Sequence, residues 1–254
     1  MEIKNKVFAI TGAGSGLGMA TVEHILSRGG MVMAIDHSKE GLDLLDHSPR
    51  VLSKHLCDVS QNDLLTTTLR QGQKHWGHIH GGIHCAGIAP AAKIYSKTKG
   101  SHSGSLFEKV ISINLLGSFY FVNAITPILL ENEPEYPDGE RGCIILTSSV
   151  ASYEGQIGQV AYAASKGGVN AMILPAAREL ASHGIRINAI APGIFKTAMV
   201  DSFPDKVQAD LAAQIPFPHR LGKPSEYGQL VISILTNVMI NGSVIRLDGA
   251  VRMT

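Results

Sequence analysis

The chain has 254 residues, of which 44% are apolar and 17% charged, and its formal net charge is +1. This apolar fraction supports a sizeable core and excludes intrinsic disorder. The small charge gives no general attraction to nucleic acid or to an anionic membrane. No run of 18 consecutive apolar residues occurs, so we expect no membrane-spanning helix.

The cysteine content and the first residues bear on the compartment. The three cysteines show no CxxC spacing, and the start of the chain lacks the long apolar region of a signal peptide. Both observations favour a reducing compartment over a disulfide framework. We therefore expect a cytoplasmic protein, or one of the mitochondrial matrix if the source is eukaryotic.

Apolar, β-branched segments alternate with helical patterns along the chain. Strands are predicted at 7–10, 31–35, 51–57, 79–85, 142–147, 185–190 and 243–247. After the first strand a helix is predicted that ends near Gly29 and Gly30, and the other clear helices are predicted at 61–75, 105–131, 158–182 and 224–236. Apolar strands separated by helices indicate a parallel sheet covered on both faces. We predict an α/β fold, a doubly wound seven-stranded parallel sheet, formed by residues 1–254 as a single domain.

Three segments break this alternation. Segments 90–105 and 131–142 are polar and are predicted to be surface loops. The segment of about 193–220 contains several prolines and leaves the sheet. We interpret it as a loop that covers a substrate.

A Gly-rich turn, residues 11–18, joins the first strand to the first helix. It reads T-G-x-x-x-G-x-G, and neither G-x-G-x-x-G nor the P-loop pattern fits it. Gly12, Gly16 and Gly18 would let the backbone approach a pyrophosphate at the helix N-terminus, where free amides favour an anion. The turn therefore indicates a dinucleotide site, and the alternative is a turn without a ligand.

Asp36 ends the second strand, 20 residues after Gly16. A carboxylate there can accept both hydroxyls of an adenosine ribose and repels a 2′-phosphate, which predicts NAD rather than NADP. No Arg or Lys stands beside it before Lys39. The alternative is that Asp36 only begins a turn. Asp58 and Val59, after the third strand, are placed to meet the adenine, although an aspartate there is also a common N-cap.

Tyr162 and Lys166 lie four residues apart on one predicted helix, so they share a face. Ser149 follows the fifth strand, at the sheet edge where ligands of α/β folds bind. A free phenol has a pKa of about 10, and a nearby ammonium favours its ionised form. The three residues together are typical of proton transfer at a carbonyl or hydroxyl group, whereas the Tyr–Lys pair alone is common by chance.

These motifs resemble those of the short-chain dehydrogenase/reductase family, from Lys6 to the C-terminus. The residues that carry the resemblance are Thr11, Gly12, Gly16, Gly18, Cys85, Ala86, Gly87, Asn114, Ser149, Tyr162, Lys166, Pro192, Gly193 and Thr197. The resemblance implies a Rossmann-like sheet, an NAD-dependent oxidoreductase activity and a homotetramer. A tetramer buries extra surface, which would explain the low charge content.

The resemblance also implies the roles of the reactive residues. Tyr162 would be the acid/base, and Lys166 would bind the nicotinamide ribose and lower the pKa of Tyr162. Ser149 would orient the substrate oxygen, and Asn114 would hold a water in a proton relay. The intact set makes an enzyme the expectation, and the alternative is a non-catalytic dinucleotide-binding scaffold.

The implied cofactor site extends from the Gly-rich turn to the nicotinamide carboxamide, which Thr197 and the backbone of Ile194 would meet. Its members are Gly12, Ser15, Gly16, Leu17, Gly18, Asp36, Asp58, Val59, Cys85, Ala86, Gly87, Tyr162, Lys166, Pro192, Gly193, Ile194 and Thr197. Two residues depart from the family pattern, His80 and His84, both in the fourth strand. The histidines at 75–84 lack a nearby carboxylate or Cys–His spacing, so no metal is predicted.

A second set of segments is similar to a subgroup of the family that acts on 3-hydroxyacyl-CoA thioesters. The segments are 132–134, 153–159, 215–222, 245–250 and the proline at 175. The interior proline is informative because it costs a helix ~3 kcal/mol or more. The similarity implies reversible oxidation of a 3-hydroxyacyl-CoA to a 3-oxoacyl-CoA. The alternative within the class is a broader alcohol or ketone oxidoreductase, acting on steroids or 3-oxoacyl carrier proteins.

Three lysines of the predicted loop 90–105 bear on this substrate. They are Lys93, Lys97 and Lys99. Their ammonium groups could meet the phosphates of coenzyme A, although a solvated loop is the simpler interpretation. Net charge and the lack of a basic run give no support to a nucleic-acid partner.

Overall fold

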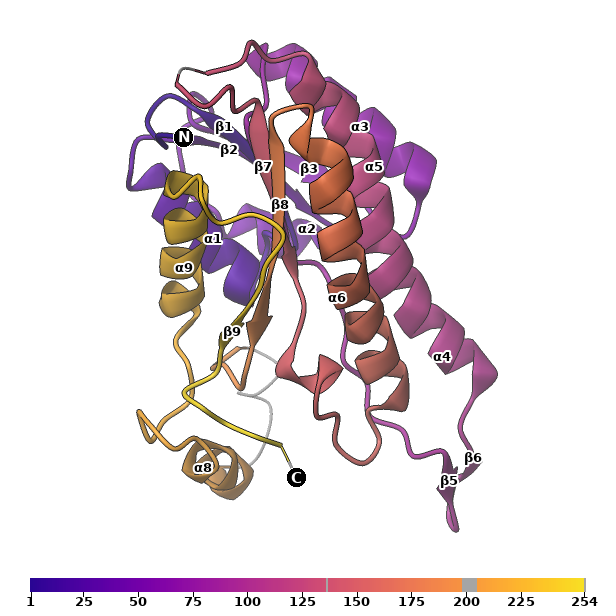
Figure 1. The fold of residues 1–254 in the computed structure, drawn as a ribbon. Helices are drawn as coiled ribbons and strands as arrows, with labels where there is room; N and C mark the ends of the chain where they lie inside the picture. Colours follow the sequence, from indigo (N-terminus) through magenta and orange to yellow (C-terminus); the bar gives the residue numbers. More distant parts are fainter. Residues whose placement is uncertain (136, 198–204, 254) are drawn as a thin grey trace.

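The computed structural model describes residues 1–135, 137–197 and 205–253 (Figure 1). Within them, seven strands form one parallel sheet in the order β3-β2-β1-β4-β7-β8-β9. The strands are β1 (Val7–Thr11), β2 (Met31–Asp36), β3 (Leu52–Leu56), β4 (Gly81–His84), β7 (Gly142–Thr147), β8 (Ile185–Pro192) and β9 (Val244–Leu247). The predicted seven-stranded parallel sheet is confirmed.

Helices cover both faces of the sheet, as predicted (Figure 1). On one face α1 (Gly16–Leu26) packs against α9 (Pro224–Thr236). The other face carries three long helices, α3 (Asn62–Trp76), α5 (Gly117–Leu130) and α6 (Val160–Ala181). The shorter helices are α2 (Lys39–Asp43), α4 (Gly104–Ile111) and α8 (Asp205–Ala213).

The strands are buried because their side chains alternate between two apolar cores. In β1, Val7 and Ala9 join the core under α3, α5 and α6, whereas Phe8 and Ile10 join the core under α1 and α9. Every residue of β1 is buried. A strand covered on both faces needs apolar residues at successive positions, which is the continuous pattern seen in the sequence.

One continuous helical stretch, Gly104–Leu130, contains α4, a π-helical turn η1 (Ser112–Leu116) and α5. Its mean hydropathy of 1.6 over the most apolar window and its length would suffice to cross a membrane. In this fold α5 packs against α3, β4 and β7 instead. Phe121, Ile125 and Ile128 are fully buried in that core.

The predicted stop of the first helix near Gly29 is confirmed, since α1 ends at Leu26 and the chain then turns at Gly29 with a φ of +74°. The structure differs from the predicted elements in three places, the first of which is the short helix α2, which was not predicted. The predicted loop 90–105 contains an antiparallel hairpin of β5 (Tyr95–Ser96) and β6 (Gly100–Ser101), which projects beyond α4 (Figure 1). The predicted substrate loop contains α8, while its residues 198–204 lie outside the described part of the chain.

The sheet order places a crevice at the carboxyl ends of the central strands. β1 is flanked by β2 on one side and by β4 on the other, so the strand order reverses between β1 and β4. In open α/β sheets ligands bind at such a reversal, outside the carboxyl ends of the strands. These ends lie toward the lower side of Figure 1, where β8 and β9 end and α6 begins.

Candidate active site

The Gly-rich turn lies between β1 and α1, and two of its glycines are required by close packing. A Cβ on Gly12, whose φ is +65°, would lie 2.7 Å from the backbone nitrogen of Ala86. A Cβ on Gly18 would collide with the carbonyl oxygen of Gly12. At Gly16 the φ of +49° also favours glycine, while the nearest atom to a Cβ is Thr197 Cγ2 at 3.4 Å. The turn thus joins β1, β4 and the segment after β8.

The start of α1 fits an anionic group. All residues of α1 are described. Its N-cap residue is Ser15, whose side chain makes no capping hydrogen bond, and its first turn carries no acidic residue. The amides of Gly16, Leu17 and Gly18 are orphan donors, as in every first helical turn. A helix N-terminus with free amides and little side-chain cover is suited to a pyrophosphate.

Asp36 lies at the end of β2, beside this turn, and is 6% exposed. Its Oδ2 accepts a hydrogen bond of 2.8 Å from the Gly14 amide, and its Oδ1 accepts one of 2.9 Å from the Ser38 amide. An ionised carboxylate has about four acceptor sites, so lone pairs remain for ribose hydroxyls. Asp36 can therefore both stabilise the turn and accept hydrogen bonds from the ribose hydroxyls.

Asp58 and Val59, predicted to meet the adenine, have structural contacts of their own. The Asp58 Oδ1 accepts the Ser60 amide at 2.9 Å and its hydroxyl at 2.7 Å. These bonds form the turn before α3, but the N-cap of α3 is Gln61, so the alternative interpretation of Asp58 as an N-cap is wrong. Val59 is buried and packs against Gly117, where a Cβ would meet its Cγ2 at 3.2 Å. Contact of either residue with adenine stays a prediction.

The segments after β4 and β8 form the other walls of the crevice. A Cβ on Gly87 would lie 3.1 Å from Asn114 Oδ1 and 3.5 Å from Lys166 Nζ. After Pro192 the chain bonds to the sheet edge, since the Gly193 amide donates to Leu247 at 2.9 Å. The structure therefore brings the predicted residues of Cys85–Gly87, Pro192–Ile194 and Thr197 to the same end of the sheet as the Gly-rich turn.

Ser149, Tyr162 and Lys166 converge next to this crevice. Ser149 lies between β7 and the 3-10 turn η2 (Val150–Ser152), and its Oγ accepts the Ala151 amide at 3.1 Å. Tyr162 and Lys166 lie in the first turns of α6, and the Lys166 Nζ is 5.9 Å from the centroid of the tyrosine ring. The Lys166 side chain is 3% exposed, and its Nζ donates to the Thr147 carbonyl at 2.7 Å.

The pKa shifts in this group have clear causes. Burial raises the pKa of Tyr162, and its hydrogen bond with Ser149 lowers it in part. Burial lowers the pKa of Lys166 to about 8, an effect that Cys85 opposes. The family resemblance implied a lowered tyrosine pKa, but in the chain alone the net direction is upward because burial outweighs the hydrogen bond.

Asn114 lies in the π-helical turn η1 and is fully buried. Its amide accepts from the Ile88 nitrogen at 2.8 Å and donates to the Ile88 oxygen at 2.8 Å and to Ser165 Oγ at 3.1 Å. The side chain therefore ties the loop after β4 to α6. π-Helical turns often occur at functional sites. The relay water expected from the resemblance stays a prediction, since the Asn114 main-chain carbonyl also has a partner, the Ser118 hydroxyl at 2.6 Å.

Sequence reasoning missed two residues beneath the site, Thr147 and Tyr227. Thr147 Oγ1 donates to the His84 carbonyl at 2.7 Å and shares a hydrogen bond of 2.7 Å with the Tyr227 hydroxyl. Tyr227, on α9, is fully buried, and burial raises its pKa. These hydrogen bonds orient Thr147, whose main-chain carbonyl accepts the hydrogen bond from the Lys166 ammonium. No local sequence signal marks either residue.

The histidines of the fourth strand are structural. The His84 Nδ1 lies 2.8 Å from Thr11 Oγ1, and the His80 Nδ1 accepts the Val7 amide at 3.1 Å. Burial lowers the pKa of His84 to about 3 and that of His80 to about 4. Among the described residues no group of three His, Cys, Asp or Glu side chains is arranged to hold a metal ion.

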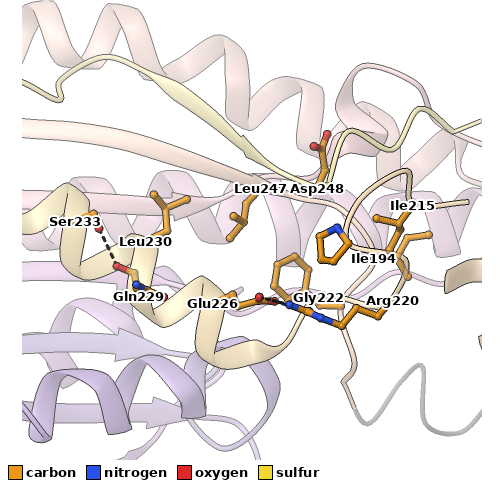
Figure 2. Close-up of a pocket in the computed structure, with 13 residues that line it drawn as sticks. Ile194, Ile215, Arg220, Gly222, Glu226, Gln229, Leu230, Ser233, Leu247 and Asp248 are labelled. Carbon is orange, nitrogen blue, oxygen red and sulfur yellow. Dashed lines mark hydrogen bonds and ion pairs between the residues drawn. The ribbon is translucent and has the colours of Figure 1, made fainter.

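A cavity of about 370 Å³ lies behind the crevice, between α9, the end of β9 and the described parts of the predicted substrate loop (Figure 2). Ile194 and Phe195 line it from one side, and Leu230 and Leu247 from the other. Arg220 and Glu226 form a bidentate ion pair across its rim, with bonds of 2.6 and 2.9 Å. None of Asn114, Ser149, Tyr162 or Lys166 is among its described lining residues.

Comparison with known proteins agrees with this geometry. The sequence model of the short chain dehydrogenase family matches residues 6–208. The chain therefore belongs to the short-chain dehydrogenases and is an oxidoreductase that works with a nicotinamide dinucleotide.

Individual relatives narrow the comparison. The chain is 43% identical to the human 3-hydroxyacyl-CoA dehydrogenase type-2 over 257 residues, covering 99% of this chain and 97% of the relative. The enzyme of the same name from Drosophila melanogaster is 42% identical, with 99% of each chain covered. The crystal structure of 3-hydroxyacyl-CoA dehydrogenase type-2 from Mycobacterium avium matches with a TM-score of 0.89 and 35% identity, covering 98% of this chain and 96% of that one.

Proposed function

We propose that the protein interconverts a 3-hydroxyacyl-CoA and a 3-oxoacyl-CoA with NAD as its preferred cofactor. The observation that carries the chemistry is the convergence of Ser149, Tyr162 and a buried Lys166 beside the Gly-rich turn. The substrate class is supported by the names of the relatives at 42–43% identity.

The dinucleotide would be held by the α1 N-terminus, by Asp36 and by the walls after β4 and β8. When bound, its nicotinamide supplies or accepts the hydride. The chain's own residues handle the substrate oxygen and its proton. Ser149 Oγ, which already accepts the Ala151 amide, donates its hydrogen to the substrate oxygen. Tyr162 takes the proton of the hydroxyl during oxidation and returns it during reduction.

Lys166 and Asn114 support this proton transfer. Lys166 is held by the Thr147 carbonyl, so its ammonium stays near the phenol, where a positive charge favours the phenolate. Asn114 keeps the loop after β4 in contact with Ser165, one residue before Lys166. We propose that Asn114 holds the water through which the proton reaches solvent. Its main-chain carbonyl accepts the Ser118 hydroxyl at 2.6 Å and has a second lone pair for this water.

The preference for NAD is supported by Asp36. Its carboxylate closes β2 and would repel a 2′-phosphate on the adenosine ribose. The neighbouring His37 is 83% exposed, and its Nδ1 lies 3.1 Å from Asp36 Oδ1.

The β5–β6 hairpin supports a thioester of coenzyme A. Lys97 and Lys99 lie in the hairpin, Lys93 lies two residues before it, and all three are exposed. The Ala92 amide, just before the hairpin, donates to the Gly158 carbonyl at 2.8 Å. Gly158 precedes α6, which carries Tyr162, so the hairpin begins at the substrate side of the site. Ammonium groups there would attract the phosphates of coenzyme A.

A substrate panel tests the proposal. The kcat/KM values of acetoacetyl-CoA, a longer 3-oxoacyl-CoA, the N-acetylcysteamine thioester of acetoacetate, a steroid ketone and a carrier-protein thioester are measured with NADH and NADPH. We expect the highest values for CoA thioesters with NADH. Activity on a steroid or a carrier protein without activity on CoA thioesters would overturn the substrate class.

Variants of the three lysines test the contact with the phosphates of coenzyme A in the same experiment. Replacing all three by glutamine should raise the KM for acetoacetyl-CoA severalfold and leave that for the N-acetylcysteamine thioester unchanged, because only the former carries phosphates. Replacing them by arginine is the matched control, since it keeps the charge. An equal effect on both thioesters would contradict a contact with the phosphates.

We also propose that the protein is a homotetramer. An apolar groove of about 560 Å³ lies between α5 and α6. Phe119, on its rim, is 50% exposed, and Met172 and Pro175 line it. A second copy of the same surface would cover these side chains, as closed homo-oligomers do.

A further inference from the structure

Asn170 occupies a distinctive place on α6. It follows Lys166 by four residues and Tyr162 by eight, so it lies on the same side of the helix. Its side chain is partly buried and has two partners from one turn. Ser148 Oγ donates to Asn170 Oδ1 at 2.5 Å, and Asn170 Nδ2 donates to Ser152 Oγ at 2.7 Å.

These two serines flank Ser149. Ser148 is fixed to the sheet, because its amide donates to the Ile190 carbonyl at 2.7 Å. Ser152 ends η2, and its Oγ donates to the Ser149 carbonyl at 2.6 Å. The amide of Asn170 therefore clamps both ends of the turn that presents Ser149, and it does so from the helix that carries Tyr162.

We propose that Asn170 is a positioning residue for the reaction, which fixes the distance between the Ser149 hydroxyl and the Tyr162 phenol. This proposal rests on the proposed function, in which both groups contact the substrate oxygen. Reactive groups need placement within about 0.5 Å, and a displacement of 1 Å can lower a rate about 100-fold. The bonds to Ser148 and Ser152 join the sheet-borne turn to the helix-borne acid/base.

The rest of the turn's contacts show why the clamp matters. Ser149 Oγ accepts the Ala151 amide, so its orientation follows that of the η2 backbone. Beyond η2 the chain is held by Glu154, which pairs with Arg246 on β9. That ion pair ties the loop to the sheet edge and not to α6. Among the described contacts, side-chain bonds from this turn to α6 run through Asn170, through Ser148 Oγ to the Lys166 carbonyl at 3.3 Å, and through the bond between Ser149 and Tyr162 whose geometry the clamp sets.

The first variant is Asn170→Ala. We expect kcat to fall about 10- to 100-fold, while the dissociation constant of NADH, measured by fluorescence, changes less than twofold.

The pH profile of the same variant supplies a readout that a purely structural role would not move. Ser149 lowers the pKa of Tyr162, whereas burial raises it, and Lys166 is the charged group that faces the ring. Tyr162 must be deprotonated to accept the proton, so loss of the serine's bond should shift the acidic limb of the oxidation profile to higher pH.

A conservative variant separates the two bonds. Asn170→Asp keeps an acceptor for Ser148 Oγ but removes the donor to Ser152, so we expect a smaller loss of kcat than in the alanine variant. Ser152→Ala removes this link and also the bond from Ser152 Oγ to the Ser149 carbonyl, so it should lose at least as much as Asn170→Asp. The double variant should be no worse than Ser152→Ala, because the Asn170–Ser152 link is already absent there.

Asn188→Ala is the matched control. Asn188, on β8, is fully buried and also bridges two groups, donating to the Ile240 carbonyl at 2.9 Å and accepting the Ser243 amide at 3.1 Å. It should lower the melting temperature without changing kcat or the pH profile, with circular dichroism confirming that every variant is folded.

The outcomes distinguish the two proposals. Wild-type kcat and pH profile in folded Asn170→Ala and Asn170→Asp, beside a large loss in Ser149→Ala, would overturn the role of Asn170 and leave the proposed function intact. Full activity of Ser149→Ala would overturn both.

Discussion

At the scale of single residues, Asp36 carries the cofactor preference. Asp36→Asn keeps a carbonyl acceptor for the Gly14 amide but removes the negative charge. With His37→Arg added, we expect the ratio of kcat/KM for NAD to that for NADP to fall at least ~100-fold, because repulsion of the 2′-phosphate is replaced by attraction. Steady-state kinetics with both cofactors measures it, and His37→Arg alone is the control. An unchanged ratio would contradict the assignment of the ribose site.

His84 makes stability depend on pH. Burial, followed by the charge of Lys166, lowers its pKa in the folded protein to about 3, against 6.5 for a free imidazole. Above pH 6.5 the group adds no pH dependence. As the pH falls from 6.5 toward 3, the unfolded chain binds the proton first, so stability is lost by up to ~1.4 kcal/mol per pH unit.

The variant His84→Asn tests this contribution. Its urea midpoint should fall less between pH 7.5 and pH 5 than that of the wild type, although its stability at pH 7.5 is lower because the bond to Thr11 Oγ1 is weakened. His80, whose pKa is lowered to about 4, is present in both proteins, so its contribution to the pH dependence of stability is the same in each. If the urea midpoints of the two proteins fall equally between pH 7.5 and pH 5, His84 does not titrate in this way.

At the scale of elements, a buried ion pair joins Glu140, in the loop before β7, to Arg186 on β8, and Arg186 in turn contacts the end of α9. The side chains are 7% and 8% exposed and lie 2.7 Å apart. Arg186 also donates to the Ile234 and Leu235 carbonyls at 2.9 and 3.0 Å, which satisfies the C-terminus of α9. Glu140→Gln leaves this guanidinium without its counter-charge.

We expect Glu140→Gln to lower the free energy of unfolding by about 3–5 kcal/mol, the usual cost of breaking a buried pair. Glu131→Gln is the matched control, because Glu131 pairs with Arg70 on the surface at 2.6 Å with its side chain 53% exposed. The control should leave the melting temperature nearly unchanged. Equal melting temperatures for the two variants would mean that the buried pair does not stabilise the contact of β8 with α9.

The elements also show what the sequence predicts well. Strands and long helices were predicted within a few residues, because a sheet covered on both faces needs unbroken apolar runs. The β5–β6 hairpin was missed, since residues 95–101 are polar and show no alternation. The π-helical turn at Ser112–Leu116 changes the hydrogen-bond register of a helix and leaves no mark on apolar periodicity.

The same distinction holds at the site. Ser149, Tyr162 and Lys166 were predicted because their spacing is local and typical of a family. Thr147, Asn170 and Tyr227 were not, because their roles arise from contacts between segments distant in sequence. The pKa of Tyr162 was expected to be lowered, but burial, which depends on the whole fold, reverses the direction in the chain alone.

At the scale of the whole molecule, the proposed tetramer gives a measurable expectation. Phe119→Glu places a charge on the rim of the groove between α5 and α6, so it should reduce the mass measured by light scattering from that of four chains to that of two or one. Ile157→Glu, which also charges an exposed apolar residue but lies outside this groove, is the control. A wild-type protein with the mass of one chain would overturn the tetramer.

The order of the strands has a consequence for synthesis of the chain. β1, β2, β3 and β4 all pair within the first 84 residues, whereas β7, the other neighbour of β4, begins at residue 142. On the ribosome, where domains fold from the N-terminus, β4 is therefore an open edge until β7 emerges. Open edges recruit other chains, but β4 is only four residues long and contains Gly81 and Gly82, so it is a poor template for them. Gly82, which lets Phe121 and Ile125 pack closely, and Gly81, which lets Phe8 do so, therefore also make β4 a weak site for aggregation of the nascent sheet.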